Sequence, residues 1–246
     1  MEKDYKTEDP LCPADISPVM GRAIRLARLL ETSRMVFLPI TGEGRGEGLF
    51  ILDNLDTITS EELEAAIASL PQWRREKTLR FKFEQGRKEC AFSYLLLCHA
   101  LREVYGITEQ PSFSFGEHGK PELSFNSQLS TLNSQLFFNI SHCKQAIACV
   151  VSDHPVGVDV ERIGRYNESL ARHVLNDSEF ALVSQSPDPQ VSFTRFWTQK
   201  EAIVKLTGRG IDDDLPNLLL KYNNVTLHTE DHLDKGYILT VANYRV

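Results

Sequence analysis

Hydrophobic positions along the chain follow two periods, one typical of helices and the other typical of strands. In the first part, spacings of three and four residues predict a helix at 61–70, a second helical stretch opening at Pro71 and a longer helix ending near Gly106. Thr59 and Glu62 form a capping-box signature before the first helix. The long helix is expected to bury Phe92, Leu95, Leu96, His99, Leu101 and Val104.

The pattern becomes loop-like between Gly106 and Asn139, with a Gly- and Pro-containing turn signal at 116–121. The peptide Asn-Ser-Gln-Leu occurs at 126–129 and again at 133–136. We interpret this duplication as a loop insertion, because solenoid repeats are far longer. Strands are predicted at 49–52, 136–140, 146–151, 156–160, 224–229 and 237–243, and helices at 169–175, 178–183 and 190–206.

Strands and helices are mixed along the whole chain, and this predicts an α+β fold. We expect the chain to divide into an N-terminal extension at 1–48 and two halves at 49–153 and 154–246. Within the extension, residues 21–30 have helical spacing. The glycine-rich segment 41–48 lacks the Gly-Lys-Ser/Thr ending of a phosphate loop, so it is interpreted as a connector.

Composition indicates a soluble globular protein: 41% of the 246 residues are hydrophobic and 25% are charged. The net charge of −7 argues against nucleic acid as the main partner. The five cysteines form no Cys-x-x-Cys pair, which favours a reducing, cytoplasmic setting over a disulfide framework or structural zinc. The acidic N-terminus is no signal peptide, and no apolar run reaches the roughly 20 residues of a membrane span.

Residues 156–161, Val-Gly-Val-Asp-Val-Glu, alternate strictly between apolar and other residues. In a strand this places Gly157, Asp159 and Glu161 on one face, with the two carboxylates about 7 Å apart. Such a pair suits a hard cation that prefers oxygen ligands. An ordinary strand with a polar outer face would give the same pattern.

Two further segments carry candidate chemistry. On the predicted helix at 190–206, Trp197, Glu201 and Lys205 lie four residues apart and share a face. A surface ion pair would explain this row equally well. Ser141 and His142 offer a hydroxyl and an imidazole at a strand end. The Gly-x-Ser-x-Gly motif of a hydrolase nucleophile is absent, so the strand end could also be structural.

Taken in order, Asn-Ile-Ser-His at 139–142, Gly-x-Asp-x-Glu at 157–161 and Trp-x-x-Lys-Glu-Ala-x-x-Lys at 197–205 resemble the 4'-phosphopantetheinyl transferase superfamily. The similarity is greatest to its Sfp-like branch of pseudodimeric enzymes. Gly-Lys-Pro at 119–121 and a basic segment at 73–81 match further family features. The resemblance covers about residues 49–211 and implies two similar halves, each with a small, mainly antiparallel sheet packed on helices.

The resemblance also implies a set of site residues. Magnesium would be held by Asp159, Glu161 and Glu201. Coenzyme A would be bound mainly by the first half, with contacts from Arg74, Lys77, Lys120, Ser141 and His142, and by Lys200 of the second half. Lys205 would stabilise the leaving 3',5'-ADP, and Glu179 would act as general base, although as a first-turn residue after a Ser178 cap it could simply stabilise a helix.

The implied reaction moves phosphopantetheine from coenzyme A to a serine of an acyl or peptidyl carrier protein, with the enzyme acting as a monomer. The chain departs from the family at Glu89 and Cys90, where relatives often have Arg and Thr near the coenzyme. Two alternatives stay open. One is a relative that binds carrier proteins or coenzyme A without transferring the group, and the other is a different magnesium-dependent phosphoryl or nucleotidyl transferase.

Overall fold

The computed structural model describes residues 30, 34–37, 47–116, 119–124, 135–164, 166–210 and 214–245, with only the backbone described at 34–37. The expected helix at 21–30, the glycine-rich connector and the duplicated peptides therefore lie largely outside the described residues. Among the described helices, none combines the length and apolar character needed to cross a membrane.

The elements follow one another in two groups. The first comprises β1 (Arg34–Phe37), β2 (Gly48–Leu52), η1 (Leu55–Thr57), α2 (Ser60–Ser69), α3 (Gln72–Leu79), α4 (Glu84–Tyr105), β3 (Ser112–Phe115), β4 (Pro121–Ser124), β5 (Phe137–His142) and β6 (Ile147–Ser152). The second comprises β7 (Val156–Arg162), α5 (Glu168–Val174), α6 (Asp177–Ser184), α7 (Pro189–Thr207), η3 (Leu215–Asn217), α8 (Leu218–Lys221), β8 (Val225–His232) and β9 (Tyr237–Tyr244).

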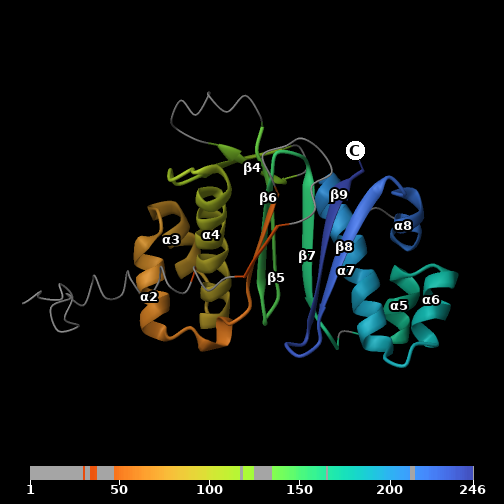
Figure 1. The fold of residues 1–246 in the computed structure, drawn as a ribbon. Helices are drawn as coiled ribbons and strands as arrows, with labels where there is room; N and C mark the ends of the chain where they lie inside the picture. The colour runs from red at the N-terminus through yellow and green to blue at the C-terminus, as the bar shows by residue number, and fades with distance from the viewer. Residues whose placement is uncertain are drawn as a thin grey trace, which may run out of the picture.

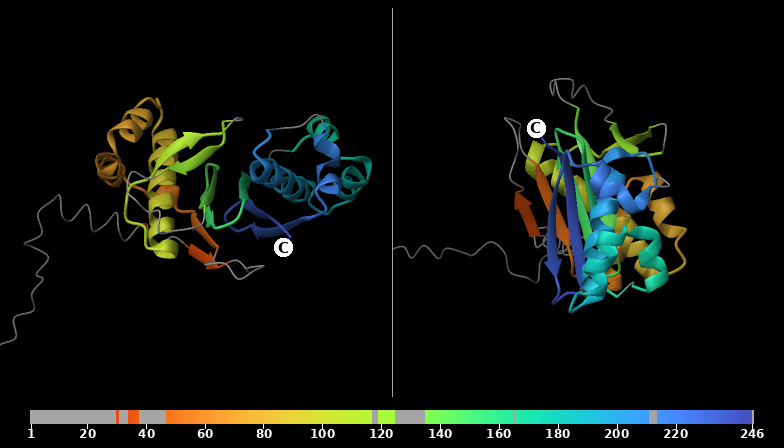
Figure 2. Two further views of the ribbon diagram at one scale, coloured as in Figure 1. Left: turned by 90° about the horizontal axis from the view of Figure 1, so that it is seen from above. Right: turned by 90° about the vertical axis from the view of Figure 1, so that its right-hand side faces the viewer.

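Each group forms its own small antiparallel sheet. The first sheet has the strand order β1-β2-β6-β5, and the second has the order β7-β9-β8. The sheets lie side by side at the centre of the molecule, with α2–α4 on one side and α5–α8 on the other (Figures 1 and 2). This arrangement confirms the predicted α+β fold of two similar halves.

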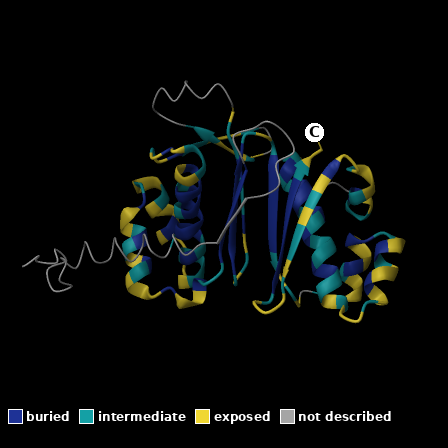
Figure 3. Cartoon of the chain, viewed as in Figure 1, coloured by how far each residue is buried: buried dark blue, intermediate teal, exposed yellow. Residues whose placement is uncertain are grey.

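The main core lies in layers between and behind these sheets. Leu49 and Ile51 of β2 pack with Val158 of β7 and Leu239 of β9 between the sheets. Successive side chains of a strand point to opposite faces, so Phe50 instead joins the cluster that includes the buried stripe of α4. Figure 3 shows strands that are mostly buried, apart from β8, lying between two groups of helices whose outer surfaces are exposed.

The alternation predicted for β7 is confirmed, and its polar face lies against α7. Val156, Val158 and Val160 belong to the core between the sheets. On the other face, a Cβ placed on Gly157 would lie 2.2 Å from the Ala202 carbonyl oxygen. Only glycine therefore permits this close approach of helix to strand. It brings the C-terminal turns of α7 over the strand that carries Asp159.

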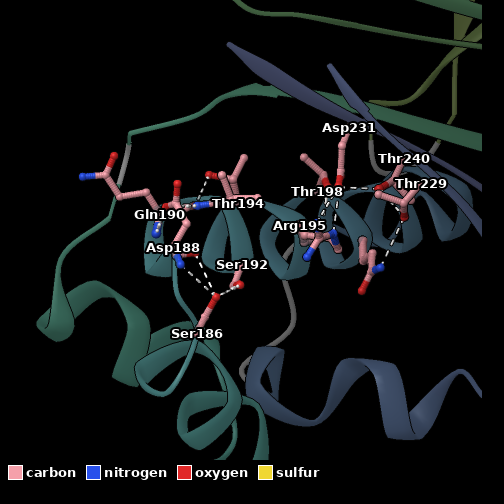
Figure 4. Close-up of polar contacts among 12 residues, drawn as sticks. Ser186, Asp188, Gln190, Ser192, Thr194, Arg195, Thr198, Thr229, Asp231 and Thr240 are labelled. Atoms are coloured by element: carbon pink, nitrogen blue, oxygen red, sulfur yellow. Dashed lines mark hydrogen bonds and ion pairs between the residues drawn. The ribbon is translucent and has the colours of Figure 1, made fainter. Parts of the chain in front are cut away.

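Polar contacts hold α7 along its length (Figure 4). Asp188 caps its N-terminus by accepting hydrogen bonds from the backbone amides of Gln190 and Val191 in the first turn. Farther along, Arg195 pairs with Asp231 of β8, and the hydroxyls of Thr198 and Thr240 are 2.9 Å apart. These contacts fix the helix against the second sheet.

Two local predictions are wrong. Part of the segment expected to be loop-like forms the β3–β4 hairpin, in which Ser112 pairs with Ser124 and Phe115 with Pro121. Its strands are four residues long and partly exposed, so they lack a strong apolar signal. Helix α6 is capped by Asn176 rather than Ser178, in a capping box closed by Glu179.

A buried carboxylate joins the two halves beside β2. Glu47 is 6% exposed, and its Oε2 accepts a hydrogen bond of 2.6 Å from Asn243 of β9. Its Oε1 has no partner among the described residues. The pKa of Glu47 is raised to about 7, mainly by burial and also by the charge of Asp153, against the opposing effects of the Asn243 hydrogen bond and of His154.

We predict that Glu47 makes the folded protein less stable as the pH rises. The folded protein keeps the Glu47 proton up to a pH of about 7, whereas the unfolded chain loses it near 4.5. The free energy of unfolding is therefore unaffected below about 4.5 and falls as the pH rises through about 7. Glu47→Gln should remove about 2 kcal/mol of this loss between pH 5.5 and 8, measured by urea unfolding. Glu64→Gln, at an exposed position of α2, serves as control. An unchanged pH profile in Glu47→Gln would contradict the prediction.

Candidate active site

The two halves meet at a contact between three polar side chains. Ser141 of β5 donates a hydrogen bond of 2.8 Å to Oδ1 of Asp159 on β7. The Lys205 ammonium of α7 lies 2.6 Å from the same oxygen and 2.7 Å from the Ser141 hydroxyl. Asp159 is 3% exposed, so its charge is compensated by these two groups from other elements.

The second oxygen of Asp159, Oδ2, is buried and has no hydrogen-bond partner among the described residues. Glu201 lies one turn before Lys205 on α7. Burial raises the pKa of Glu201, and the neighbouring carboxylates of Asp159 and Glu161 raise it too, against the opposing effect of Lys205. The three carboxylates predicted to bind magnesium therefore lie within electrostatic range of one another.

As their side chains stand, no three or more described His, Cys, Asp or Glu residues are grouped so that they could hold a metal ion. Oδ1 of Asp159 is paired with the Lys205 ammonium rather than with a metal ion. An unpartnered buried carboxylate oxygen beside two further carboxylates nevertheless has the chemistry of a hard-cation site.

A cavity of about 370 Å³ opens beside this contact. Its wall runs from α3 and α4, across the β3–β4 hairpin and β5, to Lys205 of α7. The lining residues are Trp73, Arg74, Lys77, Phe81, Gly86, Glu89, Cys90, Ser93, Tyr94, Leu97, Phe113, Phe115, Pro121, Phe138, Asn139, Ile140, His142 and Lys205. The cavity thus combines aromatic surface with cationic side chains.

Arg74 is held firmly in the cavity wall. Its Nη2 donates a hydrogen bond of 2.7 Å to the Cys90 carbonyl oxygen, and its guanidinium lies over the rings of Trp73 and Tyr94. Its Nε is buried and has no partner among the described residues. Lys77 lies one turn farther along the same helix, so α3 presents two cations to the cavity.

His142 also lines the cavity and explains the departure at Glu89. The Glu89 carboxylate lies 3.5 Å from Nδ1 of His142, and Gln85 donates a hydrogen bond to it. The Glu89 carboxylate therefore contacts a neighbouring imidazole at the position where the family resemblance implies an arginine. Cys90 receives a hydrogen bond from Thr78 through its sulfur, within the wall of the cavity.

Lys200 and Glu179 form a buried ion pair. The Lys200 ammonium lies 2.7 Å from Glu179 Oε2 and donates to the carbonyl oxygens of Leu215 and Pro216. Glu179 also accepts a hydrogen bond from the Asn176 backbone amide. Lys200 is 0% exposed and Glu179 is 6% exposed, so the pair ties α7 to α6 and to the segment before α8.

This position differs from the roles expected for both residues. Lys200 was expected to bind coenzyme A, yet its ammonium is enclosed by protein groups and does not line the cavity. Glu179 was expected to act as general base, and a base must reach the proton that it removes. Its carboxylate instead holds Lys200 and caps α6.

Lys120 and Ser141 are also not among the residues that line the cavity. Lys120 donates to two backbone carbonyls at the end of α7, and Ser141 contacts Asp159 and Lys205. Sequence reasoning missed the aromatic wall, of which Tyr94 and Phe113 are part. The sequence gives only a weak indication of this wall, because an aromatic residue in a helix or a short strand is more often part of the hydrophobic core than of a binding site.

Two family models match this chain. The model described as "4'-phosphopantetheinyl transferase, N-terminal" matches residues 57–154, and "4'-phosphopantetheinyl transferase superfamily" matches residues 155–241. A relative from Salmonella typhimurium, named 4'-phosphopantetheinyl transferase AcpT, is 33% identical over 69% of this chain and 82% of the relative. The chain belongs to the 4'-phosphopantetheinyl transferase superfamily. The two models meet at the connector between β6 and β7, where the two halves join.

Other relatives in this superfamily show how far the similarity extends. The 4'-phosphopantetheinyl transferase Sfp of Bacillus subtilis strain 168 is 24% identical over 74% of this chain and 81% of the relative, in agreement with the predicted Sfp-like branch. The 4'-phosphopantetheinyl transferase gsp of Aneurinibacillus migulanus is 35% identical over 48% of this chain. That match spans 47% of the relative's length.

We predict that Lys200→Met destabilises the fold by about 3–5 kcal/mol, because it leaves the buried Glu179 carboxylate without its charged partner. Urea unfolding measures the loss. The matched control is the double variant Lys200→Met with Glu179→Gln, which removes the unpaired charge and should recover part of the stability. Lys200→Met with wild-type stability would show that the ion pair is not buried in solution.

Proposed function

We propose that this enzyme transfers the 4'-phosphopantetheine group of coenzyme A to a serine hydroxyl of a carrier protein and releases 3',5'-ADP. Membership of the superfamily supports transfer of the phosphopantetheine group. The observation that carries the proposal is the position of Lys205, whose ammonium both lines the cationic cavity and contacts the buried Asp159.

Coenzyme A is a nucleotide with several phosphate charges and a long, mostly uncharged arm. Arg74, Lys77 and His142 supply donors to the cavity, and hydrogen bonds from cationic donors to phosphate are among the stronger ones in proteins. The rings of Trp73 and Phe113 add flat apolar surface on the same wall. We therefore assign coenzyme A to this cavity.

Asp159, Glu161 and Glu201 would hold magnesium. These three carboxylates outnumber the single Lys205 ammonium, so they leave an excess of negative charge beside the cavity. Burial is the main cause that raises the pKa of Glu201, and the charges of Asp159 and Glu161 add to it. The unpartnered Oδ2 of Asp159 fits a cation ligand. When bound, magnesium would supply positive charge to the diphosphate as its bond breaks. Binding through Oδ1 of Asp159 would also require Lys205 to leave that oxygen.

The protein's own part in the reaction is to position charges. The serine oxygen of the carrier forms a bond to the β-phosphorus of coenzyme A and releases its hydroxyl proton to solvent, while the bond from that phosphorus to the oxygen bridging the two phosphates breaks. Negative charge then grows on the leaving 3',5'-ADP. Lys205 is a cation at the cavity wall, and a cation positioned near a developing charge lowers the barrier.

Intact mass of purified carrier proteins, incubated with enzyme, coenzyme A and magnesium, tests this function. We expect the carrier to gain the phosphopantetheine group. Asp159→Ala and Glu201→Ala should each reduce the rate by about 100-fold or more. Glu64→Ala, at an exposed position of α2, is the control. Coenzyme A binding without any mass gain would favour the alternative of a relative that binds without transferring, and full activity in either variant would overturn the metal assignment.

The competition between Lys205 and a metal for Asp159 can be measured without catalysis. Mn²⁺, which is visible by electron paramagnetic resonance, replaces magnesium as the probe. Lys205→Met should bind Mn²⁺ more tightly than the wild type, by roughly five- to ten-fold, because a competing positive charge is removed. Asp159→Asn should lose Mn²⁺ binding. Weaker Mn²⁺ binding in Lys205→Met would contradict this competition.

A further inference from the structure

Lys120 connects the β3–β4 hairpin to the end of α7. It precedes β4, and its ammonium lies 2.7 Å from the carbonyl oxygen of Lys205 and 3.2 Å from that of Leu206. Helix α7 ends one residue later, at Thr207, and Gly208 follows as its C-cap with a φ of 68°. Lys120 therefore binds the last turn of α7 from the other half of the molecule.

This contact satisfies a general need of helix ends. The last carbonyls of a helix have no partner within the helix, and a positive charge near them interacts favourably with the helix dipole. The stem of Lys120 also packs on the cap, because a Cβ placed on Gly208 would lie 3.0 Å from its Cδ. Burial lowers the pKa of Lys120, and Glu122 opposes this effect.

The contact lies next to the proposed site without being part of its surface. The hairpin that precedes and follows Lys120 contributes Phe113, Phe115 and Pro121 to the cavity wall, and α7 contributes Lys205. Lys120 connects these two walls without lining the cavity, because it donates a hydrogen bond to the backbone carbonyl of Lys205, whose side chain does line the cavity.

We propose that Lys120 is a positioning residue for Lys205 rather than a coenzyme ligand. By holding the last turn of α7 it fixes the backbone from which the Lys205 side chain reaches Asp159 and the cavity. The inference rests on the proposed function for its catalytic consequence. The contact itself belongs to the fold.

Lys120→Met and Lys120→Arg separate positioning from binding. Transfer is measured by carrier mass, and binding of coenzyme A and of dephospho-coenzyme A, which lacks the 3'-phosphate, by calorimetry. For Lys120→Met we expect kcat to fall roughly ten-fold or more, since misplaced catalytic groups are costly. Both dissociation constants should change less than two-fold. Lys120→Arg, which keeps a cationic donor, should retain most of the wild-type kcat.

Hydrogen exchange gives an answer that needs no carrier protein. Lys120→Met should speed the exchange of backbone amides in the last turn of α7, and Lys120→Arg should not. This readout and the dissociation constants decide the role of Lys120 even if the wild-type enzyme transferred nothing, so the two proposals can fail separately. Weakened binding of coenzyme A but not of dephospho-coenzyme A in Lys120→Met would make Lys120 a phosphate ligand. Unchanged exchange and kcat would also overturn the proposal.

Discussion

A buried carboxylate on a central strand sets the main constraint in this structure. Asp159 is almost fully enclosed, and a buried negative charge needs both a cation and hydrogen bonds. The cation comes from Lys205 on a helix, and the hydroxyl comes from Ser141 in the other half. Lys205 can reach Asp159 because Gly157 lets α7 rest directly on β7. The close packing of one glycine thus determines where the charged groups of the site meet.

Polar contacts also define how the two halves sit on one another. The apolar faces between the sheets favour burial but are not directional. The relative orientation of the two halves is fixed by hydrogen bonds that connect one half to the other. The Asn139 side chain accepts the backbone amide of Val158 at 3.0 Å, Lys120 binds the end of α7, and Glu47 accepts from Asn243. Because the cavity is built from both halves, these contacts set its shape as well as the register of the fold.

Sequence patterns predicted the parts of the site that depend on local periodicity. Alternation in β7 placed Asp159 opposite the valine face, and helical spacing placed Glu201 one turn from Lys205. What could not be predicted depends on tertiary partners. A lysine in a motif looks the same whether its ammonium faces a ligand or backbone carbonyls, and carbonyl oxygens leave no trace in a sequence. Lys120 and Lys200 were therefore expected to bind coenzyme A, although both bond to the protein itself.

The three lysines Lys120, Lys200 and Lys205 differ in burial and in their partners, and these differences give them different roles. Lys200 is enclosed and holds helices together, and Lys120 closes the end of α7, while Lys205 alone of the three lines the cavity. A cation held by carbonyls and a carboxylate is costly to move, because the groups that it leaves would stay buried without a partner. Lys205 is different, since its side chain is partly exposed and an incoming diphosphate offers it new acceptors. The fold thus uses two lysines that bond to the protein itself, Lys120 and Lys200, to place Lys205, whose ammonium can exchange partners.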